Sequence, residues 1–468
     1  MNDFIKDPRI SNGALNAFYK RNARSGEVHS IHLLHHGETV LRIAIPPYKA
    51  DDKRESYSLS KTFIATAIGV LVTEGKLSLD ARIVDLFPDK CPEVISENLG
   101  KMRLRHVLSM NTGHEACTMT RIAFADDAVR AFLALDVEFE PGTHFTYNTG
   151  ASCILACLVE KITGMPALDY LTAKVLIPMG ITGVSWLTVS GGQSQGGCGI
   201  HISCDDIARL GQLYLNGGVW NGKRFLSEEW VREATSKISD NTGNGSPDWC
   251  AGYGFQIWQN AREGYRGDGA FGQLMVVFPE RDMVVAIQGL LGDMWGEVES
   301  VYDLVEDLYK ESDEPLCLPD YSPLSSEQKT SGLEDGFYIL SENPMDLTGM
   351  YLTYDSDKDE MCINLSNSEN TEVVRAGNGH WVDNVVFINK IKPNMPDFQP
   401  THGPARTELS ASYTAEDGKL VLSVRFRNCP HPMTWTITGD CENIKLEIED
   451  RGFMSKGAAE LAGKKFHG

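Results

Sequence analysis

A serine and a lysine stand three positions apart, at Ser58 and Lys61, where a charged segment gives way to a long apolar stretch. A serine hydroxyl becomes an effective nucleophile when a neighbouring base takes its proton. A lysine in apolar surroundings can be that base, because burial disfavours the ammonium form. The pair therefore indicates acyl transfer. The alternative is that Ser58 caps a helix while the lysine side chain extends to solvent.

The residues after Ser58 favour the chemical interpretation. Residues 59–72 are apolar on nearly every face, which is typical of a buried helix. A separation of three brings two side chains to one face of a helix, and the field of a helix N-terminus favours an oxyanion. Ser326 and Lys329 have the same spacing in a polar segment, where we predict no chemistry. The surroundings, and not the spacing, decide between the interpretations.

Strand patterns stand on both sides of a mostly helical region. Residues 27–46 read as a hairpin that turns near His36, and residues 252–290 contain two apolar strands joined by a turn. Between them, helix starts are predicted at Ser203 and Ser227. We therefore predict one antiparallel sheet assembled from distant segments, with a helical insertion.

Domain boundaries follow from changes of pattern. Residues 1–315 are predicted to hold the sheet, with the helical insertion at about 60–235. A segment rich in proline, serine and charge, 316–344, is predicted to be a linker. Residues 345–468 alternate with a period of two and are predicted to form a barrel-like antiparallel β domain. The fold class is therefore α+β followed by an all-β domain.

Three local features support narrower predictions. Asp417 and Gly418 separate two alternating runs and predict a hairpin turn. The glycine-rich segment 190–199 lacks the spacing of a phosphate-binding loop, and we expect it to be a flexible rim of a cleft. Helix-like residues at 297–310 predict one further helix.

Composition narrows the range of partners. The 468 residues carry a net charge of −21, which disfavours nucleic acid and anionic membrane surfaces as partners. No run reaches the ~20 apolar residues of a membrane span, and the first residues lack the apolar core of a signal peptide. The 11 cysteines include no CxxC pair. We expect a cytoplasmic protein without metal or cofactor, in which His32, His35 and His36 do not form a metal site.

Longer segments resemble the serine hydrolases related to class C β-lactamases. This superfamily includes D-alanyl-D-alanine carboxypeptidases, family VIII esterases and 6-aminohexanoate-dimer hydrolases. The resemblance runs in the family's order over about residues 25–310. It is carried by "YSLSKTFIATAIGVLVTEGKLSLDARIVDLFPD", "LRHVLSMNTGHE", "FEPGTHFTYNTGASCILACLVEKITG", "CGIHISCDDIARLGQLYLNGGVWNGKRFLSEEWV" and "DGAFGQLMVVFPERDMVVAIQG". It implies the β-lactamase/transpeptidase-like fold and a serine mechanism.

The resemblance also implies roles for individual residues. Ser58 corresponds to the family's nucleophile and Lys61 to its lysine. Tyr147, in "FTYNTG", corresponds to the tyrosine that relays a proton to the leaving group. Which of Lys61 and Tyr147 is the resting base stays open, and we treat them as a coupled pair. In the Tyr-x-Asn element, Thr149 replaces the asparagine and Asn148 lies between them, so both are candidates for substrate binding.

The third family motif, Lys-Thr-Gly, is absent, and the corresponding segment reads "YRGDGAFGQ". The alignment places Gly269 at the motif's glycine and lets Ala270 offer an oxyanion-binding N–H beside that of Ser58. Arg266 could supply the missing positive charge, and Asp268 is expected to be a turn residue. Loss of the motif's lysine disfavours substrates that are bound through a carboxylate.

We therefore predict a serine hydrolase that cleaves small ester or amide bonds, including those of short peptides, through an acyl-enzyme on Ser58. The altered third motif keeps open the alternative of a non-catalytic ligand-binding or sensor protein with the same fold. A weak β-lactamase, or a D-aminopeptidase or carboxypeptidase, ranks third. A homo-oligomer is compatible with the sequence.

Overall fold

The structure is a computed structural model of the 468-residue chain. It describes residues 3–343, 345–368, 370–387, 407–440, 442–450 and 458–467. The chain divides into two compact units. One comprises Met1–Ala44 and Ala50–Leu318, and the other comprises Pro319–Gly468 together with the short segment Ile45–Lys49.

In the described part of the first unit, seven strands form an antiparallel sheet in the order β1-β3-β2-β12-β11-β10-β9. The strands come from both ends of the unit, and β2 pairs with β12 so that Ile31 lies opposite Ile287. This pairing confirms the predicted sheet of distant segments. The strand bounds are β1 Phe4–Lys6, β2 Gly26–His35, β3 Glu38–Ala44, β9 Trp258–Gln259, β10 Tyr265–Gly269, β11 Gln273–Phe278 and β12 Met283–Leu291.

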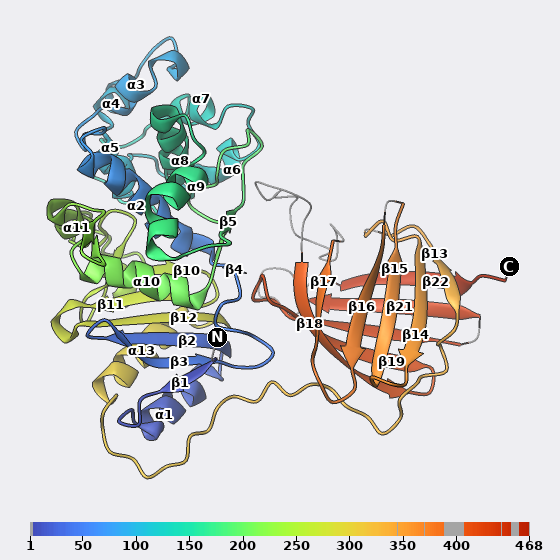
Figure 1. The fold of residues 1–468 in the computed structure, drawn as a ribbon. Helices are drawn as coiled ribbons and strands as arrows, with labels where there is room; N and C mark the ends of the chain where they lie inside the picture. The colour runs from blue at the N-terminus through green and yellow to red at the C-terminus, as the bar shows by residue number, and fades with distance from the viewer. Residues whose placement is uncertain are drawn as a thin grey trace. The chain divides into compact units, whose positions relative to one another are not determined.

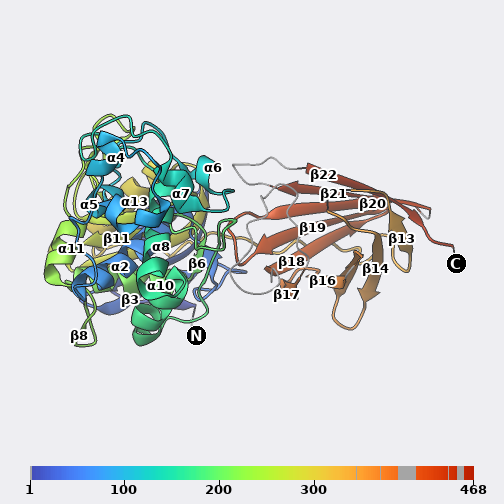
Figure 2. The same ribbon diagram turned by 90° about the horizontal axis from the view of Figure 1, so that it is seen from above.

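Helices cover both faces of this sheet (Figure 1). Helices α1 (Asn12–Asn22) and α13 (Met294–Glu306) contact each other on one face, and α10 (Cys204–Leu215) contacts β2, β11 and β12 on the other. Helix α2 (Ser60–Thr73) packs against α8 (Thr149–Thr163), and both lie over the sheet in the view from above (Figure 2). Every residue from Ser60 to Leu71 is buried, which confirms the prediction of a buried helix.

Shorter elements complete the described part of this unit. The remaining helices are α3 Ile83–Leu86, α4 Glu97–Lys101, α5 Leu104–Leu108, α6 Met119–Ile122, α7 Ala128–Leu133, α9 Ala167–Leu171, α11 Glu228–Ala234 and α12 Pro247–Cys250. The short strands are β4 Arg54–Glu55, β5 Ser185–Trp186, β6 Ile200–Ile202, β7 Val219–Trp220 and β8 Lys223–Arg224. Ser203 and Ser227 cap α10 and α11 through their side chains, as predicted.

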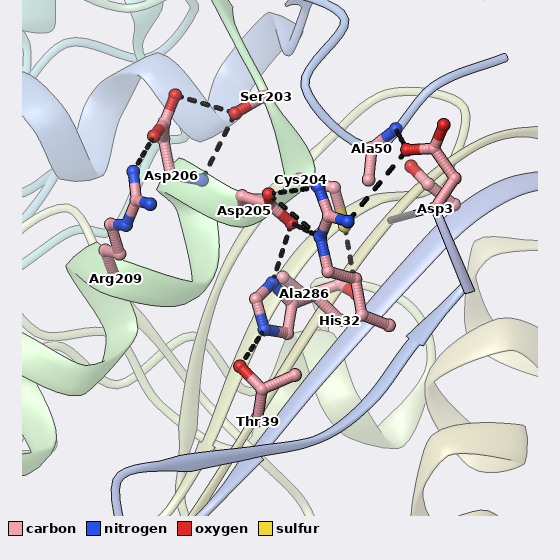
Figure 3. A network of polar contacts seen from close by, with 12 residues as sticks. Asp3, His32, Thr39, Ala50, Ser203, Cys204, Asp205, Asp206, Arg209 and Ala286 are labelled. Atoms are coloured by element: carbon pink, nitrogen blue, oxygen red, sulfur yellow. Dashed lines mark hydrogen bonds and ion pairs between the residues drawn. The ribbon is translucent and has the colours of Figure 1, made fainter. Parts of the chain in front are cut away.

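A buried ionic contact joins α10 to the sheet. The Asp205 carboxylate, in the first turn of α10, accepts hydrogen bonds from Arg42 on β3, at 2.7 Å from Nη2 and 2.9 Å from Nε. Its Oδ1 also lies 2.8 Å from Nδ1 of His32, whose other ring nitrogen contacts Thr39 (Figure 3). His32 is therefore part of the support for α10, the helix of the insertion that contacts β2, β11 and β12.

The second unit is built from β strands. In its described part, ten strands follow the order β16-β15-β14-β13-β22-β21-β20-β19-β18-β17, and a pairing of β16 with β18 closes the sheet into a barrel. The bounds are β13 Phe337–Leu340, β14 Gly349–Asp355, β15 Glu360–Ser366, β16 Thr371–Gly377, β17 Val382–Val386, β18 Thr407–Glu416, β19 Lys419–Phe426, β20 Met433–Gly439, β21 Asn443–Asp450 and β22 Ala458–Lys465.

The alternating pattern predicted this unit well. Leu420, Leu422, Val424 and Phe426 of β19 are all buried in the barrel core, and Gly418 takes a left-handed φ of 68° in the predicted hairpin turn. The predicted linker, 316–344, is too long. Strand β13 lies within it, because its buried Tyr338 and Leu340 alternate with exposed neighbours over only four residues, too short a run to be recognised among polar residues.

No single helix among the residues described is both long and apolar enough to cross a bilayer. One bent pair, Thr149–Thr163 with Ala167–Met179, meets the criterion by length and composition alone.

Candidate active site

Ser58 lies in a 3₁₀ turn, Tyr57–Leu59, that leads directly into α2. The backbone of Tyr57 has a φ of 43°, a left-handed conformation that is costly for an aromatic residue and that recurs at functional sites. Two hydrogen bonds hold the turn. The Ser60 hydroxyl donates to the Tyr57 carbonyl at 2.5 Å and accepts from the N–H of Ile200 at 3.0 Å. The turn leaves the Ser58 side chain half-buried, so that it reaches the surface.

Lys61 contacts Ser58 inside the protein. Its Nζ lies 3.1 Å from the Ser58 Oγ and donates to the Gly197 carbonyl at 2.7 Å, while the residue is 1% exposed. Burial lowers the pKa of Lys61 to about 8. Lys329, at the same spacing from Ser326, is exposed and pairs with Asp359 instead. Lys61 is therefore buried against its serine, whereas Lys329 is exposed and bound to an aspartate, as the surroundings of the two pairs in the sequence predict.

Gly197 is a site residue that the sequence reasoning missed. The end of the glycine-rich segment was expected to be a flexible rim, but residues 194–197 are buried, which corrects that prediction. A Cβ on Gly197 would lie 2.8 Å from the Thr149 side chain and 2.9 Å from that of Ser152. Only glycine lets the backbone come this close to α8, and this approach brings the carbonyl to Lys61. In the sequence, the adjacent glycines of "QGGCG" are the one feature that indicates such a close approach of the backbone to another element.

Tyr147 lies close to both Lys61 and Ser58. The Lys61 Nζ is 4.7 Å from the centroid of its ring, and the ring stacks on Trp258 at 5.2 Å. Burial, and then the negative charge of Asp268, raise the pKa of Tyr147 far above its ordinary range, while a hydrogen bond with Ser58 acts in the opposite direction. The structure thus brings Tyr147, which is distant in the sequence, to the Ser58–Lys61 pair.

The two polar residues after Tyr147 occupy different positions. Thr149 is half-buried and begins α8, next to Gly197. Asn148 is fully buried, and its Oδ1 accepts hydrogen bonds from the N–H and hydroxyl of Thr118 and from the N–H of Ala151. Asn148 therefore caps α8 and anchors the neighbouring loop. This differs from the substrate-binding role that the resemblance implied, because the preceding chain covers its side chain.

Strand β10 runs beside the nucleophile turn. A Cβ on Gly269 would lie 2.2 Å from the Ser56 carbonyl and 3.1 Å from the Leu59 nitrogen, so glycine is required for this close approach. Ala270 follows the strand directly, at the turn into β11. A Cβ on Gly267 would meet Thr62 Oγ1 at 2.5 Å. This position, two before Gly269, therefore has no room for the lysine of the family motif.

Two predictions for this strand are corrected. Asp268 is not a turn residue: it lies within β10, opposite Leu274, and is 6% exposed. Arg266 is not a free charge for substrate. Its guanidinium is fully buried, donates to Asp268, Asn260 and two backbone carbonyls, and lies 4.5 Å from the ring of Trp249. A buried guanidinium with this many acceptors supports the strand from inside.

Comparison with known proteins shows which family and fold this chain resembles. The model of the family described as beta-lactamase matches residues 25–288. A 6-aminohexanoate-dimer hydrolase from Paenarthrobacter ureafaciens is 23% identical over 266 residues, which cover 51% of this chain and 66% of that enzyme. A D-aminopeptidase from Brucella anthropi is 30% identical over 139 residues, covering 29% and 26% of the two chains. The octameric penicillin-binding protein homologue from Pyrococcus abyssi has a similar fold over 96% of this chain and 99% of its own, with a TM-score of 0.51 at 14% identity.

Proposed function

The chain belongs to the beta-lactamase family of serine hydrolases, and from that premise we propose that it hydrolyses small esters or amides, including short peptides, through an acyl-enzyme on Ser58. The observation that carries this proposal is the buried Lys61 Nζ at 3.1 Å from the Ser58 Oγ. A nucleophile and a base within hydrogen-bond distance, with the base held by a third group, are what this chemistry requires. Here the third group is the Gly197 carbonyl.

The lysine is the better candidate for the resting base. With a pKa of about 8, Lys61 is neutral in about a tenth of the molecules at pH 7. Tyr147 has its pKa raised and so keeps its proton. We infer that neutral Lys61 takes the proton of Ser58 as the serine attacks the carbonyl carbon. Tyr147 donates its own proton to the departing alcohol or amine and recovers one from Lys61.

The remaining steps follow from acyl transfer. The negative charge that forms on the carbonyl oxygen is assigned to the backbone N–H groups of Ser58 and Ala270. A water molecule then attacks the acyl-enzyme, gives a proton to the same Lys61–Tyr147 pair and releases the acid, which restores the Ser58 hydroxyl. Each bond formed to the carbonyl carbon is matched by one broken, and the protons return to their starting groups.

The third motif supports esters and simple amides over β-lactams. Position 267 has no space for the lysine that would bind a carboxylate, and Asp268 places a negative charge in this strand. The names of the relatives, a hydrolase of 6-aminohexanoate dimers and a D-aminopeptidase, support the amide class. The same altered motif favours the second candidate, a ligand-binding protein without turnover. Cytoplasmic location and self-association remain predictions.

A panel of model substrates tests the proposal. Purified protein is assayed with p-nitrophenyl esters and with D- and L-amino-acid p-nitroanilides, alongside the Ser58→Ala and Ser326→Ala variants. We expect turnover that Ser58→Ala abolishes and Ser326→Ala leaves unchanged, because Ser326 lies in the other unit with an exposed lysine. Turnover that survives Ser58→Ala would exclude this nucleophile, and absence of turnover with every substrate would favour the ligand-binding candidate.

A further inference from the structure

The buried charged side chains on and around strand β10, next to the Ser58 turn, include more carboxylates than cations. Arg266 is the cation of a buried cluster in which its Nε lies 3.1 Å from Asp268 and its Nη1 lies 4.0 Å from Asp248. One guanidinium thus faces two carboxylates, and all three side chains are at most 5% exposed. The Asp248 Oδ2 is buried and accepts no hydrogen bond from the residues described. The cluster therefore holds one more carboxylate than cation; burial raises the pKa of Asp268, and the charges of Arg266 and Lys61 oppose that rise and favour its ionised form.

This excess lies beside the catalytic groups. Gly269, the neighbour of Asp268, abuts the Ser56 carbonyl, and the Asp268 carboxylate interacts electrostatically with both Lys61 and Tyr147. Among the residues described, the other ionisable groups that interact with Lys61, Tyr147 or Asp268 add no further cation. Burial keeps Tyr253 and Cys198 protonated and neutral and raises the pKa of Glu297 well above its ordinary range, and Cys117 adds no positive charge.

Lys61 is the counter-charge only while it is protonated. The proposed mechanism uses its neutral form, in which the Asp268 charge is left without the lysine ammonium. A cationic group on the substrate would replace that charge at the moment when the base is active. A carboxylate on the substrate would instead face uncompensated repulsion, which is strong in surroundings of low dielectric constant.

Aromatic rings next to these charges have the chemistry of a cation site. Trp258 is surrounded by Phe145, Tyr147 and Trp249, with ring centroids 6.0, 5.2 and 6.3 Å away. These three surrounding rings are half-buried and so reach the surface. Two cations of the protein already lie over rings of this group, Lys61 over Tyr147 and Arg266 over Trp249. Ring faces beside a carboxylate attract ammonium groups.

We propose that Asp268 and the aromatic cluster of Phe145, Tyr147, Trp249 and Trp258 form a subsite for an ammonium group of the substrate, so that the preferred esters and amides carry an amine near the scissile carbonyl. This inference rests on the proposed function for its catalytic meaning. Its binding part does not require turnover, and the two can therefore fail separately.

Binding of three small probes of similar shape tests the subsite. Benzylammonium, benzyl alcohol and benzoate are titrated into the full-length protein at pH 7 by calorimetry. We expect benzylammonium to bind at least tenfold more tightly than benzyl alcohol, and benzoate to bind most weakly. Equal affinities for the ammonium and the alcohol, or tighter binding of benzoate, would overturn the proposal whether or not the protein is an active hydrolase.

Two variants test whether the preference for the ammonium probe depends on the charge of Asp268. Asp268→Asn keeps the size of the side chain and removes its charge, so the preference for the ammonium should fall below threefold. Asp282→Asn is the matched control and should retain the preference, because the Asp282 side chain is 48% exposed and pairs with His36 at a distant turn. A folded Asp268→Asn protein that keeps the tenfold preference contradicts the assignment. If that variant does not fold, Trp249→Leu takes its place: a reduced preference supports the subsite, and an unchanged one excludes it.

Turnover then shows whether the subsite serves the reaction. The alanine p-nitroanilides carry an α-amine, and the lactic acid p-nitroanilides replace it with a hydroxyl. We expect kcat/KM to be at least tenfold higher for the amine member, and the ratio to collapse in Asp268→Asn. Failure of the proposed function would appear differently, as no hydrolysis of any substrate while benzylammonium still binds. A ratio near one in an active enzyme would overturn the proposed substrate class.

Discussion

Replacement of Lys61 by methionine should change how the stability of the protein depends on pH. The pKa of Lys61 is about 8 in the folded protein, against an ordinary value of 10.5, because the side chain is buried. Between these two values the unfolded chain binds the proton and the folded protein does not. The free energy of unfolding therefore rises with pH across this window. Below pH 8 the lysine is protonated in both states, and the folded protein bears the full cost of burying the charge.

The magnitude follows from the two pKa values. One unit corresponds to about 1.4 kcal/mol, so the complete effect is about 3 kcal/mol, and most of it falls between pH 7 and pH 10. Methionine is of similar length and does not titrate. The free energy of unfolding of the wild type, minus that of Lys61→Met, should therefore increase by roughly 2–3 kcal/mol from pH 7 to pH 10. Loss of the hydrogen bonds to Ser58 and Gly197 adds an offset to this difference at every pH.

Urea unfolding at pH 7, 8, 9 and 10 measures the effect through tryptophan fluorescence. Trp186 and Trp230 are buried in the first unit and report on it directly. Subtraction of the variant removes the titration of all other groups. Lys329→Met is the matched control, because Lys329 is exposed, and its difference from the wild type should not change with pH. A Lys61→Met difference that is flat, or that falls with pH, would refute the reasoning.

Four further outcomes are expected. Lys61→Ala and Tyr147→Phe should each lower kcat by a factor of at least about 10². The double variant should be little less active than the poorer single variant, because the two residues act as one proton-transfer unit. A double variant whose loss of kcat is the product of the two single losses would contradict this. Gly197→Ala should lower kcat at least tenfold, because the added Cβ displaces the carbonyl that holds Lys61. Gly100→Ala is the control and should leave kcat unchanged, because a Cβ there would have its nearest contact at 3.7 Å. Equal activities of the two variants would refute the role of the loop. The kcat/KM for nitrocefin should be lower than that for p-nitrophenyl acetate, because the lysine that would bind the carboxylate of a β-lactam is missing. A higher kcat/KM for nitrocefin would refute this reasoning. Thr149→Ala should raise KM more than it lowers kcat, and a loss confined to kcat would show that Thr149 does not hold substrate.

The elements that position the site were predictable because each depends on a local pattern. The segment 59–72 is apolar on nearly every face and so predicts a buried helix, and alternation along β19 fixes which side chains fill the barrel. The antiparallel sheet was predicted because strands at both ends of the unit had to find partners. The resemblance to the family added Tyr147, which no local pattern singles out.

The residues that were missed or misplaced act through contacts between distant segments. Gly197 supplies a backbone carbonyl to Lys61, and a carbonyl has no signature in a sequence. Asp268 stands between two glycines, a composition typical of a turn, yet tertiary contact with the Ser56–Leu59 backbone keeps that segment extended. Arg266 was assigned by its charge alone, and its acceptors come from segments that only the fold brings together.

The central claim is that Ser58 is the residue that forms the covalent intermediate. Incubation of the full-length protein with a fluorophosphonate probe, followed by digestion and mass spectrometry, tests this claim most directly. The account predicts one adduct, on the peptide that contains Ser58, formed faster as the pH rises through 8 and lost in Ser58→Ala, with the Ser326 peptide unmodified. An adduct on another residue of the wild-type protein, or labelling that persists in Ser58→Ala, would contradict it.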